Sequence, residues 1–254
     1  MQQKKVKILS VDFDTDSKEI QLKKAMSRLS SGKSTKIFTP NPQILIKTQK
    51  DKALKELLSK ADITLPDGIG ISLASKMLTD FRITRIPGID FAESILNEAQ
   101  KEGYSVFLLG GKPGRAERAK ENLQKKYPSL NICGSNDGYF QKHGADNERV
   151  IEKINNSSAD ILFVCFGFPE QEKWISENSA HLPSVRLAMG LGGSIDVWSG
   201  EVKRAPRWVQ KCGLEWIWRV IKEPKRIKIF IDIPLFLHLV STQKRALRKK
   251  AKRP

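Results

Sequence analysis

Short apolar segments alternate with longer helical segments along most of this chain, and this alternation constrains the fold more than any other feature. Short strands separated by helices are typical of an α/β fold with a mainly parallel sheet. We therefore expect a Rossmann-like, mainly parallel sheet with flanking helices. The predicted strands are residues 6–13, 36–38, 63–65, 104–109, 131–133, 161–166 and 186–189. The predicted helices are residues 17–30, 42–60, 68–77, 91–102, 115–127, 147–155 and 170–179.

Polar or glycine-rich segments follow five of the predicted strands. In open α/β sheets, ligands bind outside the carboxyl ends of the strands. We therefore expect the five segments to converge on one crevice. They are Thr39-Pro40-Asn41, Pro66-Asp67-Gly68, Gly110-Gly111-Lys112-Pro113-Gly114, Gly167-Phe168-Pro169-Glu170-Gln171 and Gly190-Leu191-Gly192-Gly193.

Two of these segments are rich in glycine. Residues 110–114 follow a strand and open a helix, so their backbone suits the approach of a phosphate group. An ordinary turn between strand and helix is the alternative. The spacing matches neither the Walker motif nor the dinucleotide-binding motif. Residues 190–193 also lack a following strand with an acidic residue, which argues against an NAD-dependent epimerase or dehydrogenase. Asp196 could accept a hydrogen bond from a ribose or base, or serve as a helix N-terminal charge.

Asp67 follows a strand at the mouth of the predicted sheet. A carboxylate there can act as a general base for an attacking hydroxyl. It can equally cap the next helix, since Asp is a favoured N-cap residue. Thr39 and Asn41 either hydrogen-bond a sugar or form an Asx-type turn. The residues alone leave both pairs of alternatives open.

An Asp-x-Asp pattern, Asp12-Phe-Asp14, occurs in the first predicted strand. Such a pattern can hold Mg²⁺ or Mn²⁺ under a diphosphate. However, Asp16-Ser17 before a helical pattern looks like a cap, and no other acidic cluster lies nearby. We therefore expect no metal site.

The last 54 residues differ from the rest in composition. They carry 16 Lys and Arg against 4 Asp and Glu, or +12 of the net charge of +17, and four of the five Trp lie between positions 198 and 218. From residue 206 onward the pattern is helical, which predicts a core at 1–200 and a basic helical appendage at 201–254. No signal peptide and no apolar run of about 20 residues is visible. The appendage is expected to meet an anionic membrane. Nucleic-acid binding is the remote alternative, because it would leave the five strand-end segments without a role.

Several motifs, taken in order, resemble the WecG/TagA/CpsF family of bacterial glycosyltransferases. They include Thr39-x-Asn41, Arg204-Ala-Pro206, Glu215-Trp-x-x-Arg219 and Glu223-Pro-x-Arg226. The resemblance implies an inverting, metal-independent transferase without a cofactor. It would move N-acetylmannosamine from its UDP derivative to GlcNAc-diphospho-undecaprenol, for a teichoic-acid linkage unit, on the cytoplasmic leaflet. Some members instead transfer N-acetylmannosaminuronate or other hexoses to lipid diphosphates for surface polysaccharide.

The resemblance also implies roles for individual residues. Asp67 would be the base, Thr39 and Asn41 would line the sugar pocket, and Arg85 and Gln171 would contact the donor. The nucleotide side would comprise Gly110, Gly111, Lys112, Gly114, Gly167, Pro169, Glu170, Gly192, Gly193 and Asp196. Arg207, Arg219 and Arg226 of the appendage would neutralise the leaving diphosphate. A further family arginine is replaced by Ile229, beside Lys228. We expect no nucleic-acid partner and allow for a homo-oligomer.

Overall fold

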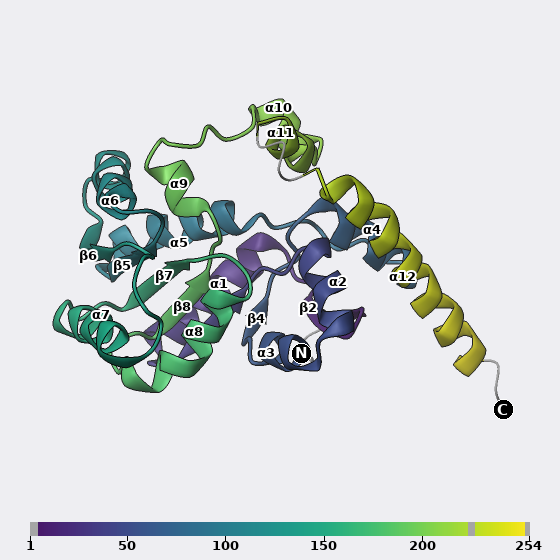
Figure 1. Ribbon diagram of the computed structural model, residues 1–254, viewed down its shortest axis with the longest axis horizontal. Coiled ribbons are helices and arrows are strands. Elements are labelled where there is room, and N and C mark those ends of the chain that lie inside the picture. The colour runs from purple at the N-terminus through teal and green to yellow at the C-terminus, as the bar shows by residue number, and fades with distance from the viewer. Residues whose placement is uncertain (1–4, 223–226, 252–254) are drawn as a thin grey trace.

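The computed structural model describes residues 5–222 and 227–251. Its main sheet has six parallel strands in the order β4-β3-β8-β7-β5-β6 (Figure 1). The predicted α/β fold with a parallel sheet and flanking helices is therefore confirmed. The strands are β3 (Thr35–Phe38), β4 (Ile63–Thr64), β5 (Ser105–Gly110), β6 (Asn131–Asn136), β7 (Ile161–Cys165) and β8 (Leu187–Gly190).

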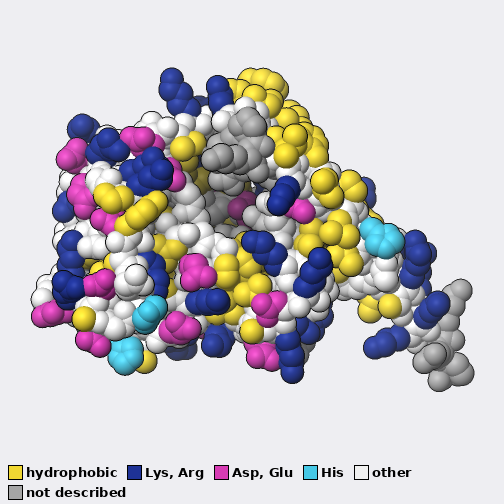
Figure 2. All heavy atoms as spheres, viewed as in Figure 1, with side chains coloured by type: hydrophobic (Ala, Val, Ile, Leu, Met, Phe, Trp, Pro, Cys, Tyr) yellow, Lys and Arg dark blue, Asp and Glu magenta, His cyan; other side chains and the backbone are white. Residues whose placement is uncertain are grey.

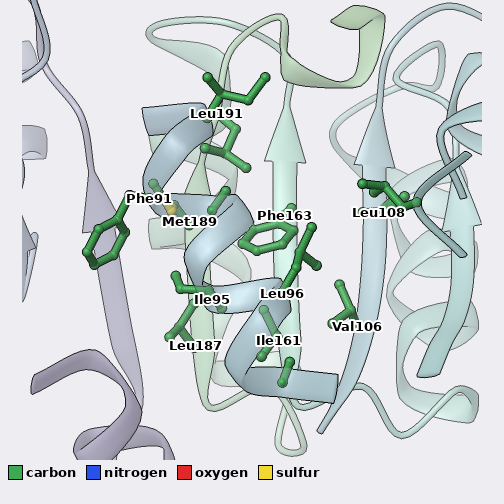
Figure 3. Packing of buried hydrophobic residues seen from close by; sticks show 14 of the residues in the cluster. Phe91, Ile95, Leu96, Val106, Leu108, Ile161, Phe163, Leu187, Met189 and Leu191 are labelled. Atoms are coloured by element: carbon green, nitrogen blue, oxygen red, sulfur yellow. The ribbon is translucent and has the colours of Figure 1, made fainter. Parts of the chain in front are cut away.

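Helices cover both faces of the sheet, because its strands are apolar on both sides. In β5, Val106 and Leu108 face one buried cluster, whereas Phe107 and Leu109 face the other. The first cluster is shown in Figure 3, where Ile95 and Leu96 lie over the sheet. Its helices are α1 (Lys18–Ser30), α5 (Gly88–Glu102), α6 (Arg115–Lys126) and α9 (Ser194–Trp198). The second face carries α2 (Pro42–Lys50), α3 (Lys52–Ser59), α4 (Ile69–Leu78), α7 (Gly144–Asn156) and α8 (Glu170–Asn178).

Two sequence-based element predictions are wrong in detail. Residues 6–13 form a hairpin of β1 (Lys5–Ile8) and β2 (Val11–Asp14), not one strand of the sheet. Leu9 and Ser10 reverse the chain there, with φ of 45° and 76°. Residues 42–60 form two helices rather than one. Asp51 has extended backbone angles, and its side chain accepts hydrogen bonds from two backbone N–H groups at the start of α3.

The strand order reverses direction between β5 and β7. From β5 the chain runs through α6 to the edge strand β6, whereas from β7 it runs through α8 towards β8. The carboxyl ends at such a reversal form the usual ligand crevice of this architecture. Gly110 ends β5 with φ of 134°, and a Cβ there would lie 2.4 Å from the carbonyl oxygen of Cys165. The two strand ends therefore approach each other too closely for any side chain at position 110.

The C-terminal arm, residues 201–251 as far as they are described, holds α10 (Arg207–Lys211), α11 (Glu215–Lys222) and α12 (Ile229–Ala251). Helix α12 lies against α2 and α4 and continues past the body of the molecule (Figure 1). Phe236 and Val240 of α12 are buried in the second cluster. Gln243 accepts from Leu9 N and donates to Lys7 O, both at 2.9 Å. Of the described helices, none is both long enough and apolar enough to span a bilayer.

Candidate active site

Asp67 lies just beyond β4, in the loop that leads into α4. The loop is held in place because Ile86 N donates to Pro66 O at 2.9 Å. The N-cap residue of α4 is Gly68, and no side chain caps this helix, so the capping alternative for Asp67 is not what the structure shows. Burial raises the pKa of Asp67 from 3.8 to about 6, and the positive charges of Arg219 and Arg85 limit the rise. The carboxylate is therefore poised to exchange a proton near neutral pH.

Arg85 lies in the loop before α5 and contacts the C-terminal arm. Its guanidinium donates to Glu215 Oε2 at 2.8 Å and to Gln210 O at 2.9 Å. Arg204 donates to the other oxygen of Glu215 at 3.3 Å and also to Asp90. These four charged side chains form one cluster beside Asp67, which we call the arm–core cluster. The sequence analysis singled out Arg85 but assigned no role to Asp90, Arg204 or Glu215.

Arg219 lies one helical turn after Glu215 on α11. The positive charge of Arg219 lowers the pKa of Asp67 and so opposes the rise that burial causes. The turn before α11 lies on the start of α4, because a Cβ at Gly213 would be 3.2 Å from Ile69. The structure thus brings Asp67, Arg85 and Arg219 together. Arg207 is exposed at the start of α10, whereas Arg226 and the side chain of Ile229 lie outside the described residues. The contact expected of Arg226 stays a prediction, and so does the question whether Lys228 takes the place of the family arginine that is missing at Ile229.

The glycine-rich segment after β5 lies beside the start of α9. A Cβ at Gly111 would meet Ile195 at 2.6 Å, so the turn after β5 is in contact with the first turn of α9. Lys112 and Gly114 are exposed ahead of α6. Asp196 accepts from Arg115 at 2.5 Å, and Gly193 is the N-cap residue of α9. Asp196 therefore binds a neighbouring arginine in this structure, and its predicted contact with the nucleotide stays a prediction.

Gln171 ties together the ends of β7 and β8. Its side-chain oxygen accepts from Gly167 N at 3.2 Å and from Gly192 N at 2.8 Å. Its amide nitrogen donates to Glu172 at 2.9 Å, and burial raises the pKa of Glu172 to about 7. Pro169 is the N-cap residue of α8. Exposed Glu170 forms an ion pair with Lys173 of the same helix. The sequence analysis missed Glu172, since nothing in its local pattern distinguishes it from a surface glutamate.

Thr39 and Asn41 follow β3 and have different surroundings. Thr39 Oγ1 lies 3.5 Å from Gly190 O, and a Cβ at Gly88 would be 3.3 Å from the Thr39 side chain. Thr39 therefore lies between the ends of β3 and β8. The side chain of Asn41 caps α2 by accepting from Ile44 N at 3.1 Å. This is the turn-forming alternative for Asn41 and leaves its predicted sugar contact untested.

The Asp-x-Asp pattern lies in the hairpin rather than in the main sheet. Asp14 is buried, accepts from Thr64 N at 2.8 Å and lies 3.6 Å from Lys24 Nζ. Asp12 is exposed and lies 3.9 Å from Lys7 Nζ. Asp14 thus fastens the hairpin to Thr64, the last residue of β4. Among the described residues, no group of three or more His, Cys, Asp or Glu side chains has a metal-binding arrangement.

Neighbouring strand ends are in contact in the structure, and the predicted crevice that all five segments share stays a prediction. The ends of β3 and β8 meet at Thr39, those of β7 and β8 meet at Gln171, and those of β5 and β7 meet at Gly110. The arm closes the side near Asp67 through Arg85 and Glu215. The arrangement offers a partly buried carboxylate, arginines whose charges act on it, and glycine-rich turns at the strand ends.

A site of this composition suits transfer of a group whose leaving group is a diphosphate. The chain belongs to the glycosyl transferase WecG/TagA/CpsF family, whose model matches residues 6–250. Curated relatives are named N-acetylglucosaminyldiphosphoundecaprenol N-acetyl-beta-D-mannosaminyltransferase. The Bacillus subtilis relative is 38% identical over 79% of this chain and 76% of its own. The Staphylococcus aureus (strain MRSA252) relative is 34% identical over 96% and 95%. The expected family is therefore confirmed.

Proposed function

We propose that this glycosyltransferase moves N-acetylmannosamine from UDP-N-acetylmannosamine to GlcNAc-diphospho-undecaprenol, with inversion at the anomeric carbon. The names of relatives that match nearly the whole chain support this acceptor and sugar. The observation that carries the chemistry is the position of Asp67, beside Arg85 and Arg219 and with a pKa of about 6. A base near neutral pH and cations beside it are what attack by a hydroxyl and departure of a diphosphate require.

In the proposed reaction, the acceptor hydroxyl loses its proton to Asp67 and its oxygen forms a bond with the anomeric carbon. The bond from that carbon to the UDP oxygen breaks on the opposite side, and the electron pair leaves with UDP. Arg85 and Arg219 stabilise the charge that develops on the diphosphate. Because Asp67 must be ionised, activity should be constant above about pH 6 and fall about tenfold per pH unit below it.

The donor nucleotide is proposed to lie across the ends of β5 and β7. Gly110 and Gly111 keep side chains away from that edge, and α6 begins just beyond them. A helix N-terminus carries free N–H groups and a partial positive charge, which suit a phosphate. Arg115 and Asp196 lie at the same edge. Gln171, which holds Gly167 and Gly192, would keep the neighbouring backbone in place around the sugar.

A panel of UDP-sugars tests the proposed donor. We expect release of UDP from UDP-N-acetylmannosamine only when a short-chain GlcNAc-diphospho-lipid is present, and at an unchanged rate in EDTA. Acceptor-dependent release from UDP-N-acetylmannosaminuronate or another donor alone would favour the alternative surface-polysaccharide function. Loss of turnover in EDTA that Mg²⁺ restores would contradict the metal-independent mechanism.

The arm is also proposed to hold the enzyme on the membrane. Its exposed apolar side chains form a band along α10 to α12 (Figure 2), consisting of Trp208, Leu214, Ile221, Ile227, Phe230, Ile231 and Leu235. Exposed basic side chains flank this band at Arg207, Lys211, Arg219, Lys222 and Lys228. Apolar insertion together with attraction to anionic headgroups binds helices to a bilayer surface. The cytoplasmic leaflet, where nucleotide sugars are available, is the proposed face.

Vesicle flotation tests the membrane proposal. We expect the protein to float with vesicles that contain anionic phospholipid. Ile221→Asp should weaken this binding at least about tenfold, because the side chain that inserts into the bilayer then carries a charge. Ile20→Asp is the matched control, since Ile20 is similarly exposed on α1, outside the apolar band. Equal binding of the Ile221 variant and the wild type would contradict the proposed face.

A further inference from the structure

The arm–core cluster joins the segment around the start of α5 to two segments of the arm that lie more than 100 positions later in the sequence. Arg85 and Asp90 come from the segment around the start of α5, Arg204 from the connection after α9, and Glu215 from α11. Glu215 is the centre of the cluster, because each of its carboxylate oxygens accepts from a different arginine. The cluster therefore links the arm to the core through two ion pairs, Arg85–Glu215 and Asp90–Arg204.

The cluster is largely buried. The side chains of Arg85, Arg204 and Glu215 are 17%, 21% and 13% exposed. Removing one member of a buried ion pair leaves its partner desolvated and unpaired, which is strongly unfavourable. The geometry of each arginine thus depends on the carboxylate that it faces. This dependence is stronger than that of the exposed ion pairs elsewhere on the surface.

Arg85 is held by the arm. Both of its hydrogen bonds in the structure go to arm residues, one to the Glu215 carboxylate and one to the carbonyl of Gln210. Gln210 is itself fastened, since its side chain donates to Ala205 O at 2.6 Å. If the arm moved away, the guanidinium would lose both acceptors. The orientation of this core arginine therefore depends on where the arm lies.

Glu215 also shares a helix face with Arg219. Residues four apart on an α-helix lie on the same side, so α11 presents a carboxylate to Arg85 and a guanidinium to Asp67. When α11 docks on the core, Arg219 comes to lie beside Asp67 and Glu215 holds the guanidinium of Arg85 at the same time. A single rigid element thus sets both cations beside the carboxylate.

We propose that Glu215 is a positioning residue that orients Arg85 in the active site only when the arm is docked. This inference rests on the proposed transferase function, because it assigns Arg85 and Asp67 to that reaction. In this role Glu215 acts through Arg85 rather than on a substrate. Its carboxylate makes the active arrangement of Arg85 conditional on the arm.

Kinetics of full-length variants at Glu215 test the proposal. We expect Glu215→Ala to lower kcat about 10- to 100-fold, as for loss of hydrogen bonds to a charged group, with a smaller change in the KM of the lipid acceptor. Glu215→Gln should keep part of the activity, since its amide oxygen can still accept from Arg85. Asp232→Asn is the matched control: Asp232 bonds Gln43 between α12 and α2 at 2.6 Å and makes no contact with Arg85. It should stay within about twofold of the wild type.

A double-mutant comparison and a pH profile separate positioning from simple loosening of the arm. Arg204→Met and Glu215→Ala should be non-additive in kcat/KM, because both act through the same cluster. In Glu215→Gln, the acid limb of the pH profile should move to lower pH. Asp67 faces Arg85 from its loop and Glu215 and Arg219 from α11, so loss of the negative charge lowers its pKa while the two arginines remain. A shift to higher pH would mean that the arginines had moved away, which would contradict the proposal.

Hydrogen exchange gives a readout that does not depend on turnover. In Glu215→Ala, backbone exchange in residues 83–88 should increase, whereas in Asp232→Asn it should not. No increase would overturn the role of Glu215 even in an active enzyme. If the wild type turns over no donor while this exchange pattern is seen, the proposed transferase reaction fails and the coupling of Arg85 to the arm stands. Glu215→Ala with wild-type kcat, or with higher kcat, would also overturn the proposal.

Discussion

Replacing Asp67 with Asn should lower kcat/KM about 10²- to 10⁴-fold, the range for loss of a general base. The amide has nearly the same shape as the carboxyl group but cannot take the proton of the acceptor hydroxyl. Donor binding should change little, because Asp67 is not among the groups proposed to hold the nucleotide. Asp80→Asn is the matched control, since Asp80 is exposed after α4. Steady-state kinetics with the lipid acceptor measure both variants.

The same substitution should stabilise the fold at neutral pH. The folded-state pKa of Asp67, about 6, lies above its ordinary value of 3.8, so ionisation is easier in the unfolded chain. The stability lost through ionisation is negligible below about pH 4, grows with rising pH and is complete above about pH 6. Asp67→Asn should therefore raise the free energy of unfolding by about 3 kcal/mol at pH 8 and by much less at pH 4. Denaturant titrations at the two pH values measure this difference.

Loss of activity together with a gain in stability is specific to a base whose ionisation is unfavourable in the folded protein. A variant that lost activity and stability alike would indicate a structural role for Asp67. A variant that kept its activity would remove Asp67 from the chemistry and require another base. If Asp67 is an ionised group that is kept in an unfavourable environment for the sake of catalysis, its replacement should raise stability and abolish activity.

Arg219→Ala should lower kcat about 10²-fold, the usual loss when one group that stabilises developing charge is removed. Arg219 is the arm residue whose charge acts most strongly on Asp67. Its removal should also raise the pKa of Asp67, so the acid limb of the pH profile should move to higher pH. Arg219→Lys should recover only part of the rate, because the ammonium lacks the planar fork that binds two phosphate oxygens.

Lys222→Ala is the matched control for Arg219. Lys222 is on the same helix and carries the same charge, but its Nζ lies over the Trp218 ring at 5.2 Å from the centroid. Both substitutions weaken membrane attraction by a similar amount, so a difference between them in detergent-solubilised assays reports the active site alone. Equal small losses in both variants would show that Arg219 acts through the membrane rather than on the leaving group.

Much of the fold could be predicted because its strands are short, apolar and separated by helices. β5 and β7 are buried along their whole length, and such runs identify the centre of a parallel sheet. The hairpin was missed because Leu9 and Ser10 are not typical of a turn with positive φ. The break at Asp51 was visible in principle, since Asp favours the N-cap position, but the helical pattern continues across it.

The candidate site was predictable where it is built from strand ends and not where it is built from long-range ion pairs. Gly110 ends β5, whereas Asp67 and Gln171 lie a few residues beyond the ends of β4 and β7, so topology alone places them at one edge. Glu215 and Arg85 are 130 positions apart, and no local pattern links them. The spacing of Glu215 and Arg219 was the available clue, because it puts both on one side of a helix. The polar contacts of Asn41 and Asp196 with their neighbours likewise depend on side-chain geometry that the sequence does not contain.

The most direct test of the account is the mass of the lipid product. Wild-type enzyme should add one N-acetylhexosamine to a short-chain GlcNAc-diphospho-lipid when given UDP-N-acetylmannosamine in EDTA, and Asp67→Asn should make almost none in the same time. An unchanged lipid mass under these conditions, with a folded enzyme and a metal-supplemented reaction also inactive, would contradict transfer of this sugar to this acceptor.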